Sequence, residues 1–177
     1  LEMIQVRSKL FTLSLSIDEG GRKNMEVKIE KHDPLKVAFI RHTGAYDTCG
    51  EAWGKLCGAP EVASKLGPDT LALSLCYDDP DVTEPDKIRM DVCVTVDDGF
   101  VPGNGIEVQT IPGGEFAVVV YNGAYSGLHD AYRAIYGEWM PKSGREFGDS
   151  YSMEIYRTDP EKTPPEESIT EIRIPLL

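Results

Sequence analysis

The sequence predicts an α+β domain made of two β-α-β-β halves, related by a pseudo-two-fold axis, with an antiparallel sheet and a central groove at their junction. Three observations predict this fold. The chain has 177 residues, which is the size of a single domain. It contains an internal repeat. Each copy of the repeat combines alternating, strand-like segments with one helical stripe of apolar residues.

The repeat relates two copies at a nearly constant spacing of 79 residues. Three segments of the first copy recur in the second: 42–46 as 121–125, 52–53 as 131–132, and 79–80 as 159–160, the last of them one residue later. A two-copy period of this length is too long for a solenoid. We therefore divide the chain into an N-terminal extension, residues 1–24, and two halves, residues 25–100 and 105–177.

The extension is expected to be a linker or an added edge strand. Phe11, Leu13, Leu15 and Ile17 alternate with hydroxyl residues, which is typical of a strand. No small-residue cleavage site follows this segment, so we do not interpret it as a secretory signal.

In the first half, residues 26–42 are strand-like until Gly44 breaks the pattern. A helix is expected over about 48–56, where the apolar residues fall on one stripe. Two further strands are expected over 71–77 and 87–96, because apolar and polar residues alternate in the second of these segments.

The second half repeats this order. A strand is expected over 105–121, and a helix follows from Ser126, its predicted N-cap, to about Trp139. Strands over 150–156 and 169–174 complete the half.

The charge balance excludes one class of partner and favours another. The chain has 18 basic and 30 acidic residues, a net charge of −12. Nucleic-acid binding needs a basic surface that displaces counterions, so direct binding of DNA is not expected. The excess of acid suits a cationic ligand or a basic partner surface. No apolar run approaches the ~18 residues of a membrane helix.

Cysteines and histidines show no pattern of metal ligands. The four cysteines form no C-x-x-C pair and the three histidines are scattered, so we expect neither a metal site nor a cofactor. Reduced cysteines in apolar stretches are typical of a cytoplasmic protein. The sequence also lacks a nucleophile elbow and a phosphate-binding loop, which favours a protein that is not an enzyme. A catalytic pair of acidic residues that are distant in the sequence and come together only in the fold stays open as an alternative.

Glu154 is the residue that the repeat singles out. At a spacing of 79 it corresponds to Leu75, an apolar residue in mid-strand. Burial of an ionised carboxylate without a partner is costly, and the usual relief is a partner or a raised pKa. Two interpretations stay open at this point. In the structural interpretation, Glu154 pairs with an arginine such as Arg89, Arg157 or Arg173, or its face is solvated. In the functional interpretation, Glu154 supplies the counter-charge of a ligand pocket.

Aromatic residues are concentrated in the second half, beside Glu154. Aromatic faces attract cations and stack on planar ligands. The alternative is that the residues of the helical stripes, such as Trp53, Tyr132 and Trp139, simply pack in the core. The candidate ligand-binding residues are Glu154, Tyr46, Trp53, Tyr121, Tyr132, Trp139, Phe147 and Tyr156.

Two motifs, together with the repeat, resemble a known family. The first is H-T-G-A-Y at 42–46 followed by Ala52-Trp53 and Leu56, and the second is M-E-I-Y-R-T-D-P at 153–160. They are similar to motifs of the GyrI-like superfamily, over about residues 25–177. That group includes the gyrase-inhibitory protein SbmC and the effector-binding domains of AraC-type (Rob-like) and MerR-type regulators. One position departs from the pattern, because Ala45 stands where the family often has proline.

The resemblance implies an SHS2-type β-α-β-β duplication and a central pocket for small, often lipophilic and cationic, molecules. It also implies that the glutamate of the E-I-Y motif, here Glu154, is the acidic residue of that pocket. No helix-turn-helix can be read in residues 1–24, so a DNA-binding domain would have to lie elsewhere.

Three functions follow as hypotheses. The first is a small-molecule effector-binding domain of the transcription-regulator type, without catalysis. The second is a stand-alone inhibitor that binds DNA gyrase through its acidic surface. The third is a hydrolase of strained electrophiles, with Glu154 as general base.

Overall fold

A computed structural model describes residues 26–148 and 151–177. The expected N-terminal extension, residues 1–24, lies outside the described residues. The strands are β1 (Val27–His32), β2 (Leu35–Thr43), β3 (Ala72–Cys76), β4 (Arg89–Thr95), β5 (Glu107–Ile111), β6 (Gly114–Asn122), β7 (Ser152–Tyr156) and β8 (Ile169–Pro175). The α-helices are α1 (Gly50–Gly58), α2 (Pro60–Ala63), α3 (Leu128–Ala134) and α4 (Met140–Ser143).

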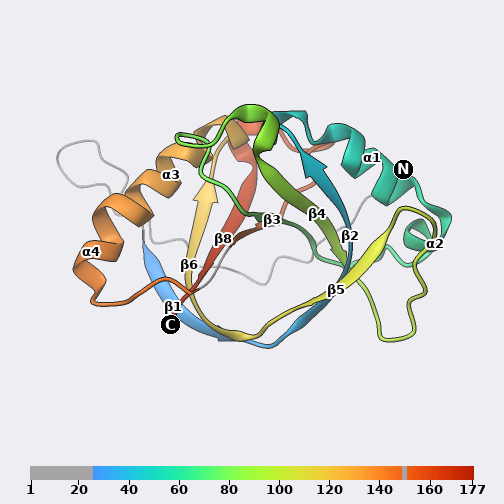
Figure 1. Ribbon diagram of the computed structural model, residues 1–177, viewed down its shortest axis with the longest axis horizontal. Helices are drawn as coiled ribbons and strands as arrows, with labels where there is room; N and C mark the ends of the chain where they lie inside the picture. Colours follow the sequence, from blue (N-terminus) through green and yellow to red (C-terminus); the bar gives the residue numbers. More distant parts are fainter. Residues whose placement is uncertain (1–25, 149–150) are drawn as a thin grey trace.

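Within these residues, the strands form one curled antiparallel sheet in the order β1-β6-β8-β7-β3-β4-β2-β5. The sheet is a half-barrel, and the helices cover its outer face in two groups, α1 with α2 on one side and α3 with α4 on the other (Figure 1). The predicted α+β class and the antiparallel sheet are therefore confirmed. None of the helices in the described part of the chain has the length and apolarity needed to cross a membrane.

Three apolar clusters hold the layers together. One lies inside the curl, where Val37 and Leu73 share a cluster with Phe116 and Ile155 from the other half of the sheet. A second packs α1 and α2 on β2 and β4, and the third packs α3 on β6 and β8. The helix clusters are separate, so the sheet surface between them, over β3 and β7, is left for a groove.

Each expected long strand contains two strands. Residues 26–42 form β1 and β2, interrupted at Pro34, and residues 105–121 contain β5 and β6, interrupted at Pro112. Proline lacks the N–H that continues a ladder. The pairing also crosses the halves, because β1 pairs with β6 and β5 pairs with β2. Each half is thus completed by an edge strand from the other.

The register at the centre of the sheet corrects the predicted match between Glu154 and Leu75. Glu154 lies opposite Ser74, whereas Leu75 lies opposite Met153 inside the curl. Side chains alternate between the two faces of a strand, so a shift of one residue changes the face. The spacing of 79 fails here, because a spacing of 80 relates Ser74 to Glu154.

The second expected helix is not one regular α-helix. It is a 3-10 turn, η3 (Tyr125–Gly127), followed by α3, a π-helical segment, η4 (Ile135–Trp139), and α4. Ser126 lies within η3 and does not cap α3, which begins without a side-chain cap. The remaining 3-10 turns are η1 (Tyr46–Thr48), η2 (Pro85–Lys87) and η5 (Pro165–Glu167).

Candidate ligand-binding site

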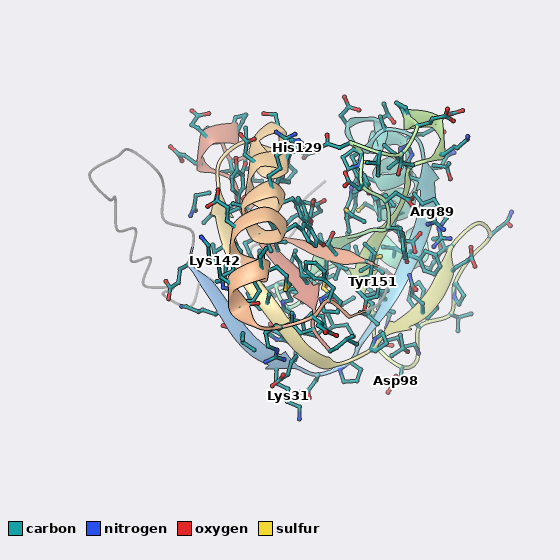
Figure 2. All side chains as sticks on the ribbon, turned by 60° about the vertical axis from the view of Figure 1, so that its left-hand side comes forward. Lys31, Arg89, Asp98, His129, Lys142 and Tyr151 are labelled. Carbon is teal, nitrogen blue, oxygen red and sulfur yellow. The ribbon has the colours of Figure 1, made fainter. Side chains whose placement is uncertain are left out.

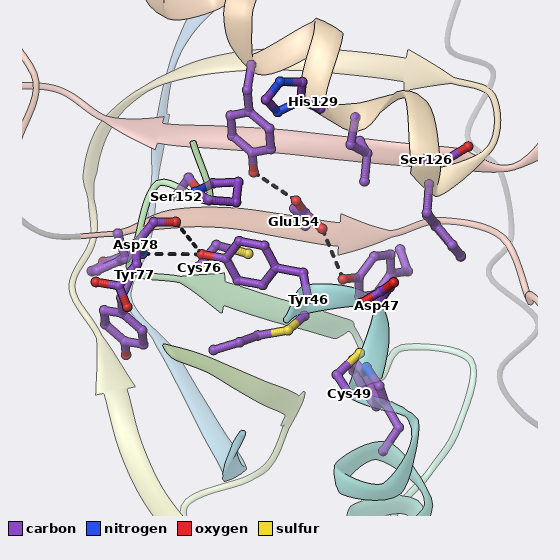
Figure 3. Close-up of a pocket in the computed structure, with 18 of the residues that line it drawn as sticks. Tyr46, Asp47, Cys49, Cys76, Tyr77, Asp78, Ser126, His129, Ser152 and Glu154 are labelled. Atoms are coloured by element: carbon purple, nitrogen blue, oxygen red, sulfur yellow. Dashed lines mark hydrogen bonds between the residues drawn. The ribbon is translucent and has the colours of Figure 1, made fainter. Parts of the chain in front are cut away.

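A cavity of about 1290 Å³ lies between α1 and α3, above β3 and β7. Figure 2 shows the two helix groups rising as arms from the sheet, and Figure 3 looks into the space between them. The two central strands supply the floor with alternate side chains, including Cys76, Ser152 and Glu154. The predicted groove between the halves is therefore present, and its volume is above the roughly 300–1,000 Å³ of typical small-molecule pockets, so it has room for a bulky ligand.

Glu154 lies at the bottom of the cavity and is only 8% exposed. Its Oε1 accepts a hydrogen bond from the Tyr132 hydroxyl at 3.0 Å, and its Oε2 accepts one from the Tyr156 hydroxyl at 3.1 Å. The Tyr156 oxygen also lies 2.9 Å from Ser74 Oγ. A tyrosine has one hydroxyl proton, so when Tyr156 donates to Glu154, Ser74 donates to Tyr156.

Burial raises the pKa of Glu154 above its ordinary value, because the apolar surroundings disfavour the charged form. Hydrogen bonds from Tyr132, Tyr156 and Cys76 stabilise the carboxylate and offset part of this rise. The partners are all neutral. Within the described residues, no lysine, arginine or histidine forms an ion pair with Glu154.

Two other buried carboxylates are neutralised by arginine. Asp91, fully buried in β4, accepts two hydrogen bonds from Arg41, at 2.7 and 2.9 Å, and one from the Tyr77 hydroxyl at 2.7 Å. Glu171 in β8 accepts hydrogen bonds from Arg157 and from Arg173. Glu154 therefore differs from both in being the carboxylate whose charge the protein does not neutralise.

Aromatic side chains form the walls beside Glu154. The rings of Trp53 and Tyr125 each pack edge-to-face against the Tyr156 ring. Their centroids lie 5.8 and 5.5 Å, respectively, from the Tyr156 centroid. Tyr132 stacks on Tyr136 at 6.2 Å, and Tyr136 contacts Phe147 at 4.5 Å. These rings offer faces to a cation or to a planar ligand.

Tyr46 is held at the cavity wall by its hydroxyl group. The hydroxyl donates to the Asp78 carbonyl oxygen at 2.5 Å and accepts from the Asp78 N–H at 3.2 Å. Burial raises the pKa of this phenol. Figure 3 shows the Tyr46 ring extending toward Asp78.

The structure brings six of the eight candidate residues together and separates two. The six that line the cavity are Tyr46, Trp53, Tyr132, Phe147, Glu154 and Tyr156. Trp139 instead packs against the cluster under α3. Tyr121 packs there too, and its hydroxyl donates to the Ala124 carbonyl oxygen in the turn before η3.

Tyr125 and Tyr136 line the cavity but were not among the candidates. A signal for each is present in the sequence. Tyr125 corresponds to Tyr46 at the spacing of 79, and Tyr136 follows Tyr132 by four residues, the spacing of one helix face. Burial raises the pKa of Tyr136 to about 12, so it stays neutral.

The rim of the cavity is acidic. Besides Glu154, the carboxylates that line the cavity are Asp47, Asp78, Asp79, Asp81, Asp159 and Glu161. The basic or titratable nitrogen groups among the described lining residues are His129 and Arg133, and both contact Asp81. The cavity as a whole therefore favours a cation over an anion.

Three of the cysteines, Cys49, Cys57 and Cys76, line the cavity as free thiols. Burial raises the pKa of each thiol, which favours the protonated form. In the residues that the structure describes, no group of three or more His, Cys, Asp or Glu side chains is arranged to hold a metal ion.

A model of the family described as "GyrI-like small molecule binding domain" matches residues 25–177. The chain belongs to the GyrI-like family. The family membership inferred from the two motifs is thus confirmed. The family description assigns small-molecule binding to the domain that contains this cavity.

The relatives of this GyrI-like chain include proteins named as gyrase inhibitors and proteins named as transcription regulators. A DNA gyrase inhibitor of Serratia proteamaculans is 30% identical over 140 residues, which cover 76% of this chain and 88% of the relative. The probable transcriptional regulator YgiV of Escherichia coli is 26% identical over 104 residues, 58% of this chain and 64% of the relative. Gyrase inhibitors and transcription regulators are therefore both among its homologues.

Solved structures share the fold. EcmrR in its complex with DNA superposes with a TM-score of 0.73 at 18% identity, over 86% of this chain and 57% of that chain. SAV2435 bound to tetraphenylphosphonium superposes with a TM-score of 0.60 at 18% identity, over 86% of this chain and 94% of that chain. At this level of identity the likeness concerns the fold.

Proposed function

We propose that this GyrI-like domain is an effector-binding domain of the transcription-regulator type, which binds lipophilic organic cations between α1 and α3 and releases them unchanged. Glu154 supplies the negative charge, and the rings of Trp53, Tyr132 and Tyr156 contact the apolar part of the ligand. The same proposal places the protein in the cytoplasm, where its free cysteines stay reduced.

One observation carries the proposal. Of the three deeply buried carboxylates considered above, Asp91 and Glu171 have arginine partners, while Glu154 has hydroxyl donors only. Tyrosine hydroxyls hold the carboxylate in place without cancelling its charge. A cation that enters the cavity completes the ion pair that the protein leaves open, and aromatic rings add attraction of roughly 0.5–2 kcal/mol per contact.

The relatives support this assignment. YgiV is named a regulator, EcmrR is bound to DNA, and SAV2435 was solved with a lipophilic cation. In a regulator, the ligand must bind one arrangement of the protein more tightly than another to shift the equilibrium between them. The acidic domain described here is proposed to bind the ligand, and contact with DNA would be made by other residues.

We also propose that residues 25–100 and 105–177 are two SHS2-type copies related by a pseudo-two-fold axis. The strand order supports this, because β2, β4 and β3 on one side of the centre mirror β6, β8 and β7 on the other. Under this symmetry Glu154 and Ser74 occupy equivalent places, so the buried carboxylate of the central strands is present in one half only.

The test compares two ligands of similar shape and different charge. Methyltriphenylphosphonium is a cation, and triphenylphosphine oxide is neutral. Isothermal titration on wild type and on Glu154→Gln is expected to give at least a tenfold loss of affinity for the cation, or about 1.4 kcal/mol. The affinity for the neutral compound is expected to change less than threefold.

A matched control removes a rim carboxylate by the same chemical change. Glu161→Gln is expected to weaken cation binding only slightly, and less at high salt, because exposed charges are screened. Wild type that binds neither compound would overturn the proposal, and so would equal losses for both compounds in Glu154→Gln. Mass spectrometry of the recovered ligand checks that no bond is broken, and turnover would favour the hydrolase hypothesis instead.

A second candidate function is inhibition of DNA gyrase. The observation that favours it is the match of 30% identity to a DNA gyrase inhibitor over 76% of this chain. The net charge of −12 suits a basic partner surface. A supercoiling assay with purified gyrase tests it: inhibition that weakens with added salt supports this function, and unchanged supercoiling at micromolar protein contradicts it.

A further inference from the structure

The two helices that flank the cavity present different surfaces to it. α1 presents Gly50, Gly54 and Gly58, which are spaced four residues apart and all line the cavity. A Cβ atom added at any of the three would meet no atom within 4 Å. Glycine is a poor helix former because it loses the most backbone freedom on folding. Three glycines on one helix face therefore weaken α1 and leave empty space against its backbone.

The other wall is occupied at two of the three corresponding places, because Gly58 corresponds to another glycine, Gly137. A spacing of 79 residues takes Gly50 to His129 and Gly54 to Arg133, both of which line the cavity from α3. His129 Nε2 lies 3.5 Å and Arg133 Nη2 lies 3.4 Å from Asp81 Oδ2. Asp81 belongs to the loop between β3 and η2, in the other half of the chain. Side chains thus bridge the mouth of the cavity on the α3 side, near the labelled His129 in Figure 2.

The empty space beside α1 and the buried carboxylate belong to the same cavity and are linked by two aromatic rings. Trp53, next to Gly54 on the same wall, contacts the Tyr156 ring at 5.8 Å, and Tyr156 donates to Glu154 at 3.1 Å. Glu154 is more than nine-tenths buried, faces the same cavity and has no cationic partner among the described residues. A cation held at Glu154 would therefore place its bulky substituents on the side that has room, against α1.

We infer that the glycine face of α1 is a recess for the bulky part of the ligand, and that Gly50 and Gly54 determine how large a cation the cavity accepts. This inference rests on the function proposed above. Without a Cβ atom, a ligand ring can approach the helix backbone closely. The α3 side, filled by His129 and Arg133, defines the narrower wall.

Gly54→Leu tests the inference, because it fills the recess without removing a charge or an aromatic ring. The probes are tetraphenylphosphonium, which is bulky, and N,N,N-trimethylanilinium, which has a single ring. We expect Gly54→Leu to weaken tetraphenylphosphonium binding at least tenfold and trimethylanilinium binding less than threefold, as measured by isothermal titration.

The matched control is Gly137→Leu. Gly137 lies in η4, is exposed, does not line the cavity, and has no atom within 4 Å of an added Cβ. We expect it to change neither affinity. Gly54→Ala is a milder variant, expected to raise the melting temperature through its better helix propensity and to weaken tetraphenylphosphonium binding less than the leucine does.

The outcomes separate this inference from the proposed function. Wild-type affinity for tetraphenylphosphonium in Gly54→Leu, with wild type binding both probes, would overturn the recess and leave the cation site intact. An equal loss of affinity for both probes in a folded Gly54→Leu variant would also overturn the recess, because the substitution would then have disturbed the whole site. Absence of binding of either probe to wild type contradicts the proposed function itself.

Discussion

Two buried glutamates lie on paired strands of the second half, Glu154 in β7 and Glu171 in β8, and their surroundings differ. Glu154 faces the helices and the cavity, whereas Glu171 faces the inside of the curl, opposite Ile155. Burial alone would raise the pKa of both. For Glu171, the charges of Arg173 and Arg157 outweigh burial and hold its pKa below the ordinary value.

The comparison shows how one fold uses the same side chain for structure and for binding. Glu171 is 3% exposed and Glu154 is 8% exposed, so exposure does not separate them. The partners do. An arginine partner makes a carboxylate part of the fold, while tyrosine hydroxyls orient a carboxylate and leave its charge available to a ligand.

The largest expected effect comes from removing each charge in turn. Glu171→Gln leaves the buried Arg173 without its counter-charge, so we expect the free energy of unfolding at pH 7 to fall by about 3–5 kcal/mol. Glu154→Gln removes a charge that burial disfavours, so the free energy of unfolding is expected to rise. Urea unfolding measures both, and a drop of similar size in both variants would contradict the contrast.

The next effect is the pH dependence of stability, with opposite signs for the two residues. The pKa of Glu154 is raised in the folded state, so the folded protein binds more protons above the ordinary value of 4.5. Stability then falls as pH rises from 4.5 to the folded pKa. The pKa of Glu171 is lowered, so its contribution is present above 4.5 and is lost as pH falls toward its folded pKa.

Urea titrations at a series of pH values check these signs. In Glu154→Gln the fall above pH 4.5 is expected to disappear, because glutamine does not titrate. Each unit of pKa shift is worth about 1.4 kcal/mol. The same fall in wild type and in Glu154→Gln would mean that another group is responsible.

The smallest effect that we predict concerns ligand binding. As the pH is lowered below the pKa of Glu154 in the ligand-free protein, the affinity for methyltriphenylphosphonium is expected to fall up to tenfold per pH unit. The reason is that the carboxyl group must lose its proton to pair with the cation. Affinity for triphenylphosphine oxide is expected to stay constant. Isothermal titration at several pH values measures both, and parallel changes for the two ligands would refute the ion pair.

A smaller contrast between the halves concerns Tyr121 and its counterpart His42. His42 Nε2 lies 3.1 Å from the Ala45 carbonyl oxygen and 3.1 Å from Thr48 Oγ1. Tyr121 reaches the equivalent carbonyl of Ala124, and Gly127 replaces the threonine. A Cβ atom at Gly127 would collide with the Tyr121 hydroxyl oxygen in its present position, so the longer side chain occupies the space that this glycine leaves. Tyr121 therefore closes a turn and does not line the cavity.

The sequence by itself determined the α+β class, the central strands and helix regions of each half, and Glu154 as a candidate ligand-binding residue. These follow from local periodicity and from the two motifs, which need no knowledge of how distant segments meet. For Trp53 and Tyr132 it left two interpretations open, core packing and a place in the groove, and both residues line the cavity.

Only the tertiary structure decided what surrounds each residue. The exchange of β1 and β5 between the halves, the partner of Glu154 in β3, and the exclusion of Trp139 from the cavity depend on pairing and packing between segments far apart in the chain. The physical reason is that strand register changes the face of a side chain with a shift of one residue. A repeat spacing that varies between 79 and 80 leaves that shift undetermined until the strands pair.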